Sequence, residues 1–233
     1  MEKNTKRVVA LALNIVVFLM MVLSVTLMIF GINFMGKDVL LSTTGWEIFK
    51  FFTVDSNILM GVIAAIYVVY LALFLDGKIA RLPRWLSVLK LVGTVGVSLT
   101  FLTVVAFLAP FVAPTYWSLF VNAQLFMHLL TPVVSIITFV FFEDTDDIRL
   151  RETLWGMLPM VVYSIFYMTT AFTHIVDGKV PYQYDWYAFV QLGLWQIAVS
   201  LPVMLGATYL ISWLLWLGNR GVYKAGQKRL ARK

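Results

Sequence analysis

The stretch FKFFTVDSNILMGVIAAIYVVYLALFL, residues 49–75, decides the fold class of this chain. After Asn57 it contains no charged residue as far as Leu75, which approaches the ~20 apolar residues that a membrane-spanning helix needs. It lacks the alternation of apolar and polar residues that is typical of a barrel strand. Because lipid offers backbone groups no hydrogen-bond partner, an apolar run of this length and pattern is expected to be a helix.

The rest of the chain has the same character. Hydrophobic residues make up 61% and charged residues 13% of its 233 positions, which is more apolar surface than a soluble domain of this size can bury. The sequence therefore predicts an all-α integral membrane protein with one six-helix transmembrane domain and no soluble domain. The first run is too long for a signal-peptide core and lacks a cleavage site, so we expect it to be retained. The expected helices cover approximately residues 8–34, 46–75, 85–109, 119–142, 154–173 and 188–217, followed by a basic cytoplasmic tail, 218–233.

The basic residues predict the orientation. Fifteen of the eighteen Lys and Arg residues lie on one side of the expected spans, with Lys90 counted in the loop that follows the second span. The other side has Lys37, Lys50 and Lys179. The positive-inside rule then places both termini in the cytoplasm. Because topology explains the net charge of +6, no nucleic-acid partner is expected, whereas the tail is expected to contact membrane lipids.

Polar residues recur on single faces of several expected helices. In the second span Thr53 shares a face with Asn57, whereas Asp55 points about 160° away from Thr53. Residues spaced by three or four share one face of a helix, and polar faces within lipid are expected to meet. Two such stripes have steps of four, three and four: Gln124, His128, Thr131 and Ser135, and Tyr163, Tyr167, Thr170 and His174.

A depth estimate places Thr53 and His128 at one level. Thr44 and Glu47 have the spacing of a capping box, which predicts that the second helix begins near Gly45. The fourth helix is expected to begin between residues 114 and 118. Both Thr53 and His128 would then lie ~12–15 Å below the non-cytoplasmic ends of their helices.

A purely structural role is the alternative for most of these residues. Threonine, glutamine and tyrosine side chains in spanning helices often serve only as interhelical hydrogen bonds. An ionisable side chain in mid-span usually marks a site or a pathway, which favours function for His128. Asp55 is interpreted either as a site member or as a buried structural partner. His174 lies at the outer edge of the fifth span, where a histidine is common at the membrane interface and needs no functional explanation.

Three segments resemble the androgen-induced integral membrane family. They are FKFFTVDSNIL with Thr53, NAQLFMHLLTP with His128, and FTHIVDGKVPYQYD before the last span. The best-known members of that family are threonine hydrolases that cleave fatty acid esters of hydroxy fatty acids. The chain looks closest to a bacterial branch in which the threonine opens a T-x-x-S-N pattern, here TVDSN. The resemblance implies a six-span fold in a bacterial inner membrane.

The resemblance also implies a threonine nucleophile, Thr53, and a histidine base, His128, acting on a lipid ester. A threonine hydroxyl needs a neighbouring base to remove its proton, and a neutral histidine within ~2.6–3.2 Å is suited to that. Asn57, Gln124 and Tyr167 are candidate donors to the oxyanion, and Thr131, Tyr163 and His174 are candidate supporting residues. Asp55 faces away, which leaves the third member of a triad open.

Other functions remain as alternatives. A small-solute carrier would use Asp55 and His128 as a proton relay, and a noncatalytic lipid-binding protein would need neither. A metal site from His128, His174 and Asp177 has no supporting ligand spacing, so neither a metal nor another cofactor is expected. The absence of cysteine excludes disulfides, zinc-thiolate sites and a cysteine nucleophile.

Overall fold

The computed structural model describes residues 3–36, 43–143, 145, 148–191 and 193–230. Within these ranges the chain is helical and forms no β-strand, apart from one isolated bridge between Val176 and Lys179. Six helices in these described ranges are long and apolar enough to cross a membrane, as the sequence predicts, which indicates a multi-pass membrane protein. The α-helices are α1 (Lys3–Ile29), α2 (Phe52–Leu75), α3 (Arg84–Thr103), α4 (Ala109–Phe111), α5 (Asn122–Leu125), α6 (Thr131–Ile137), α7 (Leu158–Thr173) and α8 (Leu194–Leu230).

Three of the six spans change their helical register on the way. The third span combines α3, a π-helical segment (Val104–Leu108) and α4. The fourth span combines α5, a π-helical segment (Phe126–Leu130), α6 and a second π-helical segment (Thr138–Phe142). The fifth opens with a 3₁₀ helix (Leu150–Met157) before α7. Such interruptions within long helices often accompany functional sites.

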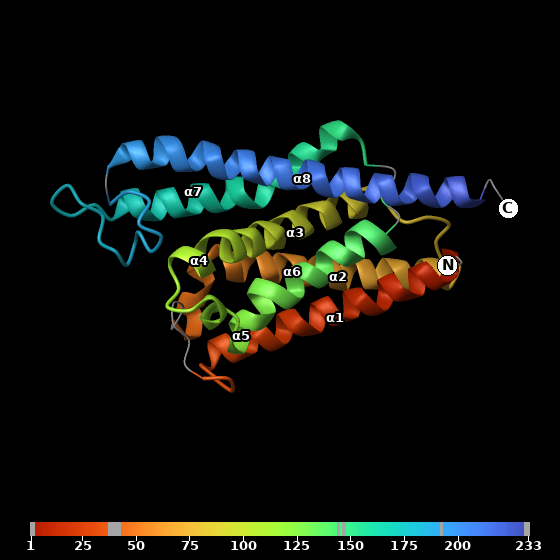
Figure 1. Ribbon diagram of the computed structural model, residues 1–233, viewed down its shortest axis with the longest axis horizontal. Helices are drawn as coiled ribbons and strands as arrows, with labels where there is room; N and C mark the ends of the chain where they lie inside the picture. The colour runs from red at the N-terminus through yellow and green to blue at the C-terminus, as the bar shows by residue number, and fades with distance from the viewer. Residues whose placement is uncertain (1–2, 37–42, 144, 146–147, 192, 231–233) are drawn as a thin grey trace.

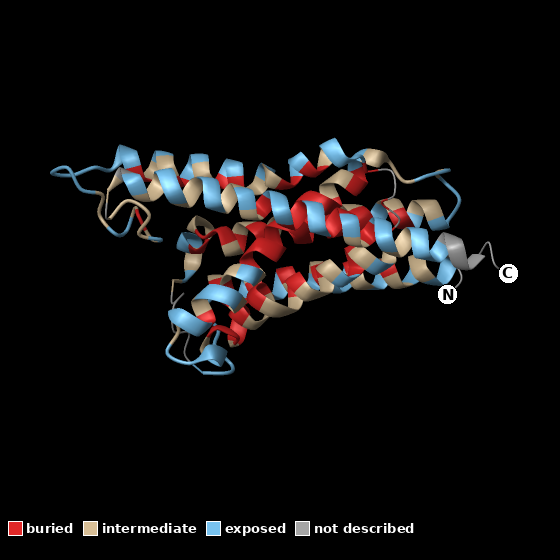
Figure 2. Ribbon diagram, turned by 45° about the horizontal axis from the view of Figure 1, so that its top comes forward, coloured by how far each residue is buried: buried red, intermediate tan, exposed pale blue. Residues whose placement is uncertain are grey.

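α3 is the central helix of the bundle. Every residue from Lys90 to Thr100 is buried, and the buried residues in Figure 2 concentrate around it. A Cβ added at Gly93 would lie 3.0 Å from the side chains of Ile63 and Met60, so the glycine lets α2 approach closely. Close packing through small residues is how helices associate in lipid, where no hydrophobic force draws them together.

The N-terminal end of α1 and the C-terminal end of α8 lie at the same end of the bundle (Figure 1). We call this the termini end; it is the end that the basic residues predict to be cytoplasmic. The described part of the segment between α7 and α8, residues 174–191 and 193, extends at the opposite end, which we call the loop end (Figure 1). α8 continues as one helix to Leu230, so most of the expected 218–233 tail belongs to the last helix.

The second span begins differently from the sequence prediction. Gly45–Lys50 is a separate 3₁₀ helix, and α2 begins at Phe52. Thr44 caps the 3₁₀ helix without a side-chain hydrogen bond, so the expected capping box is wrong. Thr53 is the second residue of α2, while His128 is the seventh residue of the fourth span. Equal depth therefore does not follow from counting residues, and packing between the two elements decides their proximity.

The count of basic residues assigns Lys90 to a loop, although the expected span 85–109 contains it, and this assignment is wrong. The side chain is fully buried within α3 and forms an ion pair with Glu143. Lys90 is the seventh residue of its span, which the count of basic loop residues could not recognise. The orientation rule loses one of its supporting charges, while Arg84 remains at the boundary, paired with Glu152 at 2.5 Å.

Candidate functional site

His128 is held in one orientation inside the loop-end half of the bundle. Its side chain is only 3% exposed, and Nδ1 lies 2.8 Å from the carbonyl oxygen of Leu119. A carbonyl only accepts hydrogen bonds, so Nδ1 carries the hydrogen. In a neutral imidazole Nε2 is then free to accept a proton. This is the tautomer that a general base needs.

The sequence around His128 explains why α2 attaches here. In the π-helical register the Thr131 N–H donates to the carbonyl of Phe126, five residues back. The next donor in that register would be Pro132, which has no N–H. The carbonyl of Met127 instead accepts from Asn57 Nδ2 at 3.2 Å. Because Pro132 has no N–H, the Met127 carbonyl is available to Asn57, and this bond fixes α2 beside His128.

Asn57 also connects this contact to Thr53. Its Nδ2 donates to the Thr53 carbonyl at 2.7 Å as well as to Met127, and the whole Asn57 side chain is buried. Thr53 itself is half-buried, and its hydroxyl forms no hydrogen bond with His128 or with any other part of the chain that the structure describes. The structure brings the two residues onto adjoining elements, and a direct bond between them stays a prediction.

The polar face of the fourth span lies in the interior, where polar groups need partners. Gln124, His128, Thr131 and Ser135 are all buried. Neither amide atom of Gln124 has a hydrogen-bond partner among the described residues, and the hydroxyls of Thr131 and Ser135 also lack one. Interhelical bonding alone predicts that these groups are paired. Unpaired buried groups instead indicate a site for water or a ligand.

The second predicted stripe does not join the first. The Tyr163 hydroxyl donates to the Lys50 carbonyl at 2.6 Å, and the Tyr167 hydroxyl donates to Asp185. His174 is exposed, stacks on Tyr184 with ring centroids 3.8 Å apart, and contacts its own helix. These residues hold the loop end together, away from the polar face of the fourth span.

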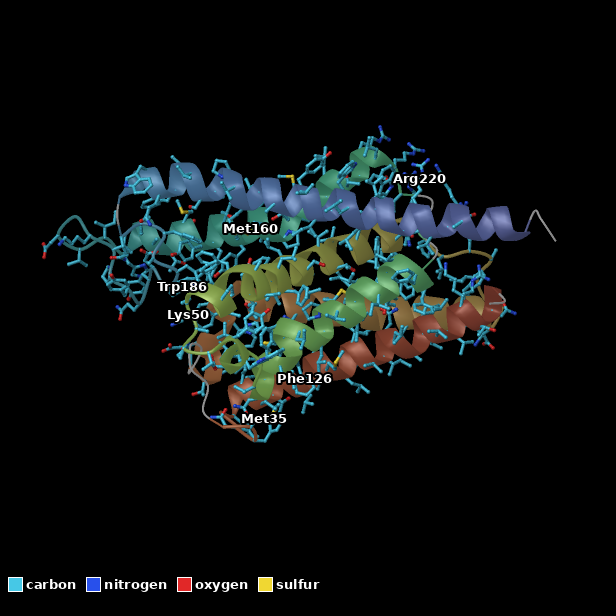
Figure 3. All side chains as sticks on the ribbon, in the orientation of Figure 1. Met35, Lys50, Phe126, Met160, Trp186 and Arg220 are labelled. Carbon is cyan, nitrogen blue, oxygen red and sulfur yellow. The ribbon has the colours of Figure 1, made fainter. Side chains whose placement is uncertain are left out.

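Sequence reasoning missed the part of the loop that closes this end, residues 185–189. Asp185 is fully buried and accepts from Gln191 Nε2 at 2.6 Å, from the Phe189 N–H at 2.9 Å and from Tyr167. Trp186, at the loop end (Figure 3), donates to the Tyr163 hydroxyl at 3.0 Å, and that hydroxyl in turn donates to the Lys50 carbonyl. The sequence signal that could have identified this segment is the charged Asp185 within the aromatic run YDWYAF.

Tyr187 attaches the same segment to the start of α2. Its hydroxyl accepts from the Phe52 N–H at 3.2 Å. The residue leaves 36% of its surface exposed, but the hydroxyl end is enclosed, and this burial raises the pKa of Tyr187 to about 12. The phenol therefore stays protonated at neutral pH and holds the loop against the residue that precedes Thr53.

Asp55 faces a different space. It lines a groove of about 400 Å³ between α2, α3 and α7, together with Ser56, Tyr163 and Phe166. Its carboxylate forms no hydrogen bond or ion pair with any residue in the described ranges. The lining includes neither Thr53 nor His128. Asp55 and Asn57 thus contact different neighbours of α2, in agreement with the helical spacing, and Asp55 does not orient His128.

No group of three His, Cys, Asp or Glu residues able to hold a metal occurs within the described residues. The structure does not assemble a site from His128, His174 and Asp177.

Comparisons with protein-family models, with curated proteins and with solved structures found no match for this chain.

Proposed function

We propose that the chain is an intramembrane hydrolase of lipid acyl esters, with Thr53 as nucleophile and His128 as base. The observation that carries the proposal is the buried hydrogen bond from His128 Nδ1 to the Leu119 carbonyl. This bond favours the tautomer of His128 that can act as a base. The π-helical segment that carries His128 contacts α2 at Asn57, about one turn after Thr53. In this proposal the Leu119 carbonyl orients the His128 imidazole, as the carboxylate does in a Ser-His-Asp triad.

The proposed reaction has two halves. His128 Nε2 takes the proton of the Thr53 hydroxyl as Oγ1 attacks the ester carbonyl carbon, and the imidazolium then returns that proton to the leaving alkoxide. Water next attacks the acyl-threonine with the same base, which releases the fatty acid and restores both side chains. Hydrogen bonds between catalytic groups are often absent before substrate binds, so Thr53 and His128 are expected to join in the substrate complex.

The hydrogen bonds also rank the candidate oxyanion donors. Tyr167 is committed to Asp185, and Asn57 Nδ2 already donates twice. Gln124 lies one turn before His128 and is buried, and its Nε2 has no hydrogen-bond partner in the part of the chain that the structure describes. We therefore assign Gln124 as the donor to the developing oxyanion; loss of such a donor typically reduces the rate by about 10²–10³.

The location supports a lipid substrate. A hydroxyl nucleophile at the loop end of an apolar bundle meets esters of the surrounding lipid without drawing them through bulk water. The basic residues favour a cytoplasmic termini end, so the site would face the non-cytoplasmic side of what we propose is a bacterial inner membrane.

The test is ester turnover by purified protein in detergent, with a fluorogenic long-chain acyl ester. Thr53→Ala and His128→Ala are each expected to abolish turnover, because each removes one half of the nucleophile and base pair. His174→Ala is the matched control, since that imidazole lies outside the site. A fluorophosphonate probe should label Thr53. Wild-type turnover by Thr53→Ala, or labelling at another residue, would exclude the mechanism.

The other functions predict different results in the same preparation. The carrier alternative relied on Asp55 and His128 as one relay, and the structure places Asp55 on the groove between α2, α3 and α7 instead. A carrier predicts solute uptake by proteoliposomes that Asp55→Asn abolishes, without ester turnover. A noncatalytic lipid-binding protein predicts neither uptake nor turnover.

A further inference from the structure

A second polar cluster lies at the termini-end half of the bundle, far from Thr53 in the sequence. Lys90 Nζ lies 3.0 Å from Glu143 Oε1 and donates to Asn14 Oδ1 at 2.6 Å. Asn14 Nδ2 completes the triangle by donating to Glu143 Oε1 at 2.9 Å. The cluster joins α1, α3 and the end of the fourth span. All three side chains are buried, and both charged ones are 0% exposed.

One oxygen of the cluster has no partner within the described ranges. Glu143 Oε2 is buried and has no hydrogen-bond partner among the residues that the structure describes. Burying an ion pair is favourable only when every remaining lone pair is satisfied, and ionisable groups inside a membrane usually mark a functional site. An ion pair that only held helices together would be more stable with a hydrogen bond to Glu143 Oε2. The free oxygen points instead to exchange with a small polar species.

Two polar faces lead from this cluster toward His128. On α3 the residues Lys90, Thr94 and Ser98 follow at steps of four, so they lie on one face, and all three are buried. The Thr94 and Ser98 hydroxyls donate to the Lys90 and Thr94 carbonyls at 2.7 and 2.6 Å, so each offers a further molecule only its acceptor oxygen. The opposing fourth span carries the unpartnered hydroxyls of Thr131 and Ser135. α3 packs directly against α6, which bears these two residues. Between His128 and Glu143 the fourth span rises ~22 Å, at 1.5 Å per residue.

Buried hydroxyls without a protein partner are groups to which internal water binds where the space allows. Between His128 and Glu143 the polar side chains of the fourth span are those of Thr131, Ser135 and Thr138, and all three are buried. The two π-helical segments of the fourth span mark the ends of the same path, because one contains His128 and the other ends just before Glu143. A file of hydrogen-bonded water at these hydroxyls would conduct protons.

We propose that the interface between α3 and the fourth span is a hydrated proton path, and that the Lys90–Glu143–Asn14 cluster is its proton-exchange site. A proton arriving from the His128 side binds Glu143 Oε2 and converts the carboxylate to the acid. The Lys90 ammonium then releases a proton toward the termini end, and transfer of the Glu143 proton to the amine restores the ion pair. One proton enters and one leaves in each cycle, and Asp55 takes no part.

Proton flux into phosphatidylethanolamine–phosphatidylglycerol vesicles tests the path. The full chain is reconstituted, a potassium gradient with valinomycin sets the membrane potential, and an enclosed pH dye reports the flux. Wild-type protein is expected to exceed protein-free vesicles by about tenfold or more, because a buried charge pair and polar file lower the barrier to a proton. The charge-neutral double variant Lys90→Met, Glu143→Gln is expected to return the flux to the protein-free level.

A matched pair of threonine variants separates the path from general packing. Thr131→Val removes an unpartnered hydroxyl and should reduce the flux by roughly fivefold or more. Thr138→Val makes the same substitution at an equally buried residue whose hydroxyl already bonds to the Val134 carbonyl at 2.6 Å. It should stay within about twofold of wild type. Ser135→Ala replaces Thr131→Val if that variant does not fold.

Three results would overturn the proposal: wild-type flux equal to that of protein-free vesicles, full flux in the charge-neutral variant, or equal flux in Thr131→Val and Thr138→Val. The measurement uses no ester, so it stands whichever way the hydrolase assay turns out.

Discussion

Replacing Lys90 by methionine is expected to be among the most destabilising single changes in the chain. The substitution leaves the Glu143 carboxylate buried beside an apolar side chain, since both members of the pair are 0% exposed. Breaking one side of a buried ion pair typically destabilises a protein by about 3–5 kcal/mol. Asn14 Oδ1 also loses its donor at 2.6 Å, which adds about 1 kcal/mol for an unsatisfied buried acceptor.

The double variant Lys90→Met, Glu143→Gln should recover most of that loss. It removes both charges, and replacement of a whole buried pair by neutral groups of similar volume is often close to neutral. The coupling free energy between the two positions is therefore expected to be about 3 kcal/mol. Lys50→Met is the control, because the side chains of the Lys50–Glu47 pair are 24% and 74% exposed, so water screens the pair and it should contribute about 0–1 kcal/mol.

The assay is reversible unfolding in mixed micelles by titration with sodium dodecyl sulfate, followed by tryptophan fluorescence. The four proteins of the double-mutant cycle are measured in one detergent mixture. Additive effects of the two single changes, or a Lys90→Met variant within about 0.5 kcal/mol of wild type, would show that the pair is not buried as described.

Three further predictions concern the packing and the loop end. Gly156→Ala should destabilise the protein by about 1–3 kcal/mol in the same titration, because the added Cβ overlaps with α8, whereas Gly206→Ala, with nothing within 4 Å, should not destabilise it. Tyr167→Phe leaves buried Asp185 without one of its donors, so limited proteolysis between α7 and α8 should become faster than in wild type. Burial raises the pKa of Tyr187 from 10.0 to about 12. The contribution of this shift to stability is therefore complete below pH 10 and is lost as the pH rises to about 12. Tyr187→Phe should remove this part of the alkaline loss of stability in the micelle titration.

The sequence by itself determined the properties that depend on short stretches of chain. The lengths of the hydrophobic runs alone predict six spans. In lipid the backbone groups cannot hydrogen-bond to water, so each run must satisfy them within its own helix. Helical period alone put Gln124, His128, Thr131 and Ser135 on one face, and that face is buried. These features need only local rules of length and period.

Only the tertiary structure decided which polar groups meet. The Asn14–Glu143 bond joins residues 129 positions apart. The expected span 85–109 contains Lys90, but only the fold shows that Glu143 is its partner. The start of α2 depends on packing as well, since it follows a 3₁₀ helix that the propensities of Thr44 and Glu47 did not reveal. In lipid a polar side chain is stable only where another segment supplies its partner, so its role is fixed by the neighbours that folding brings to it.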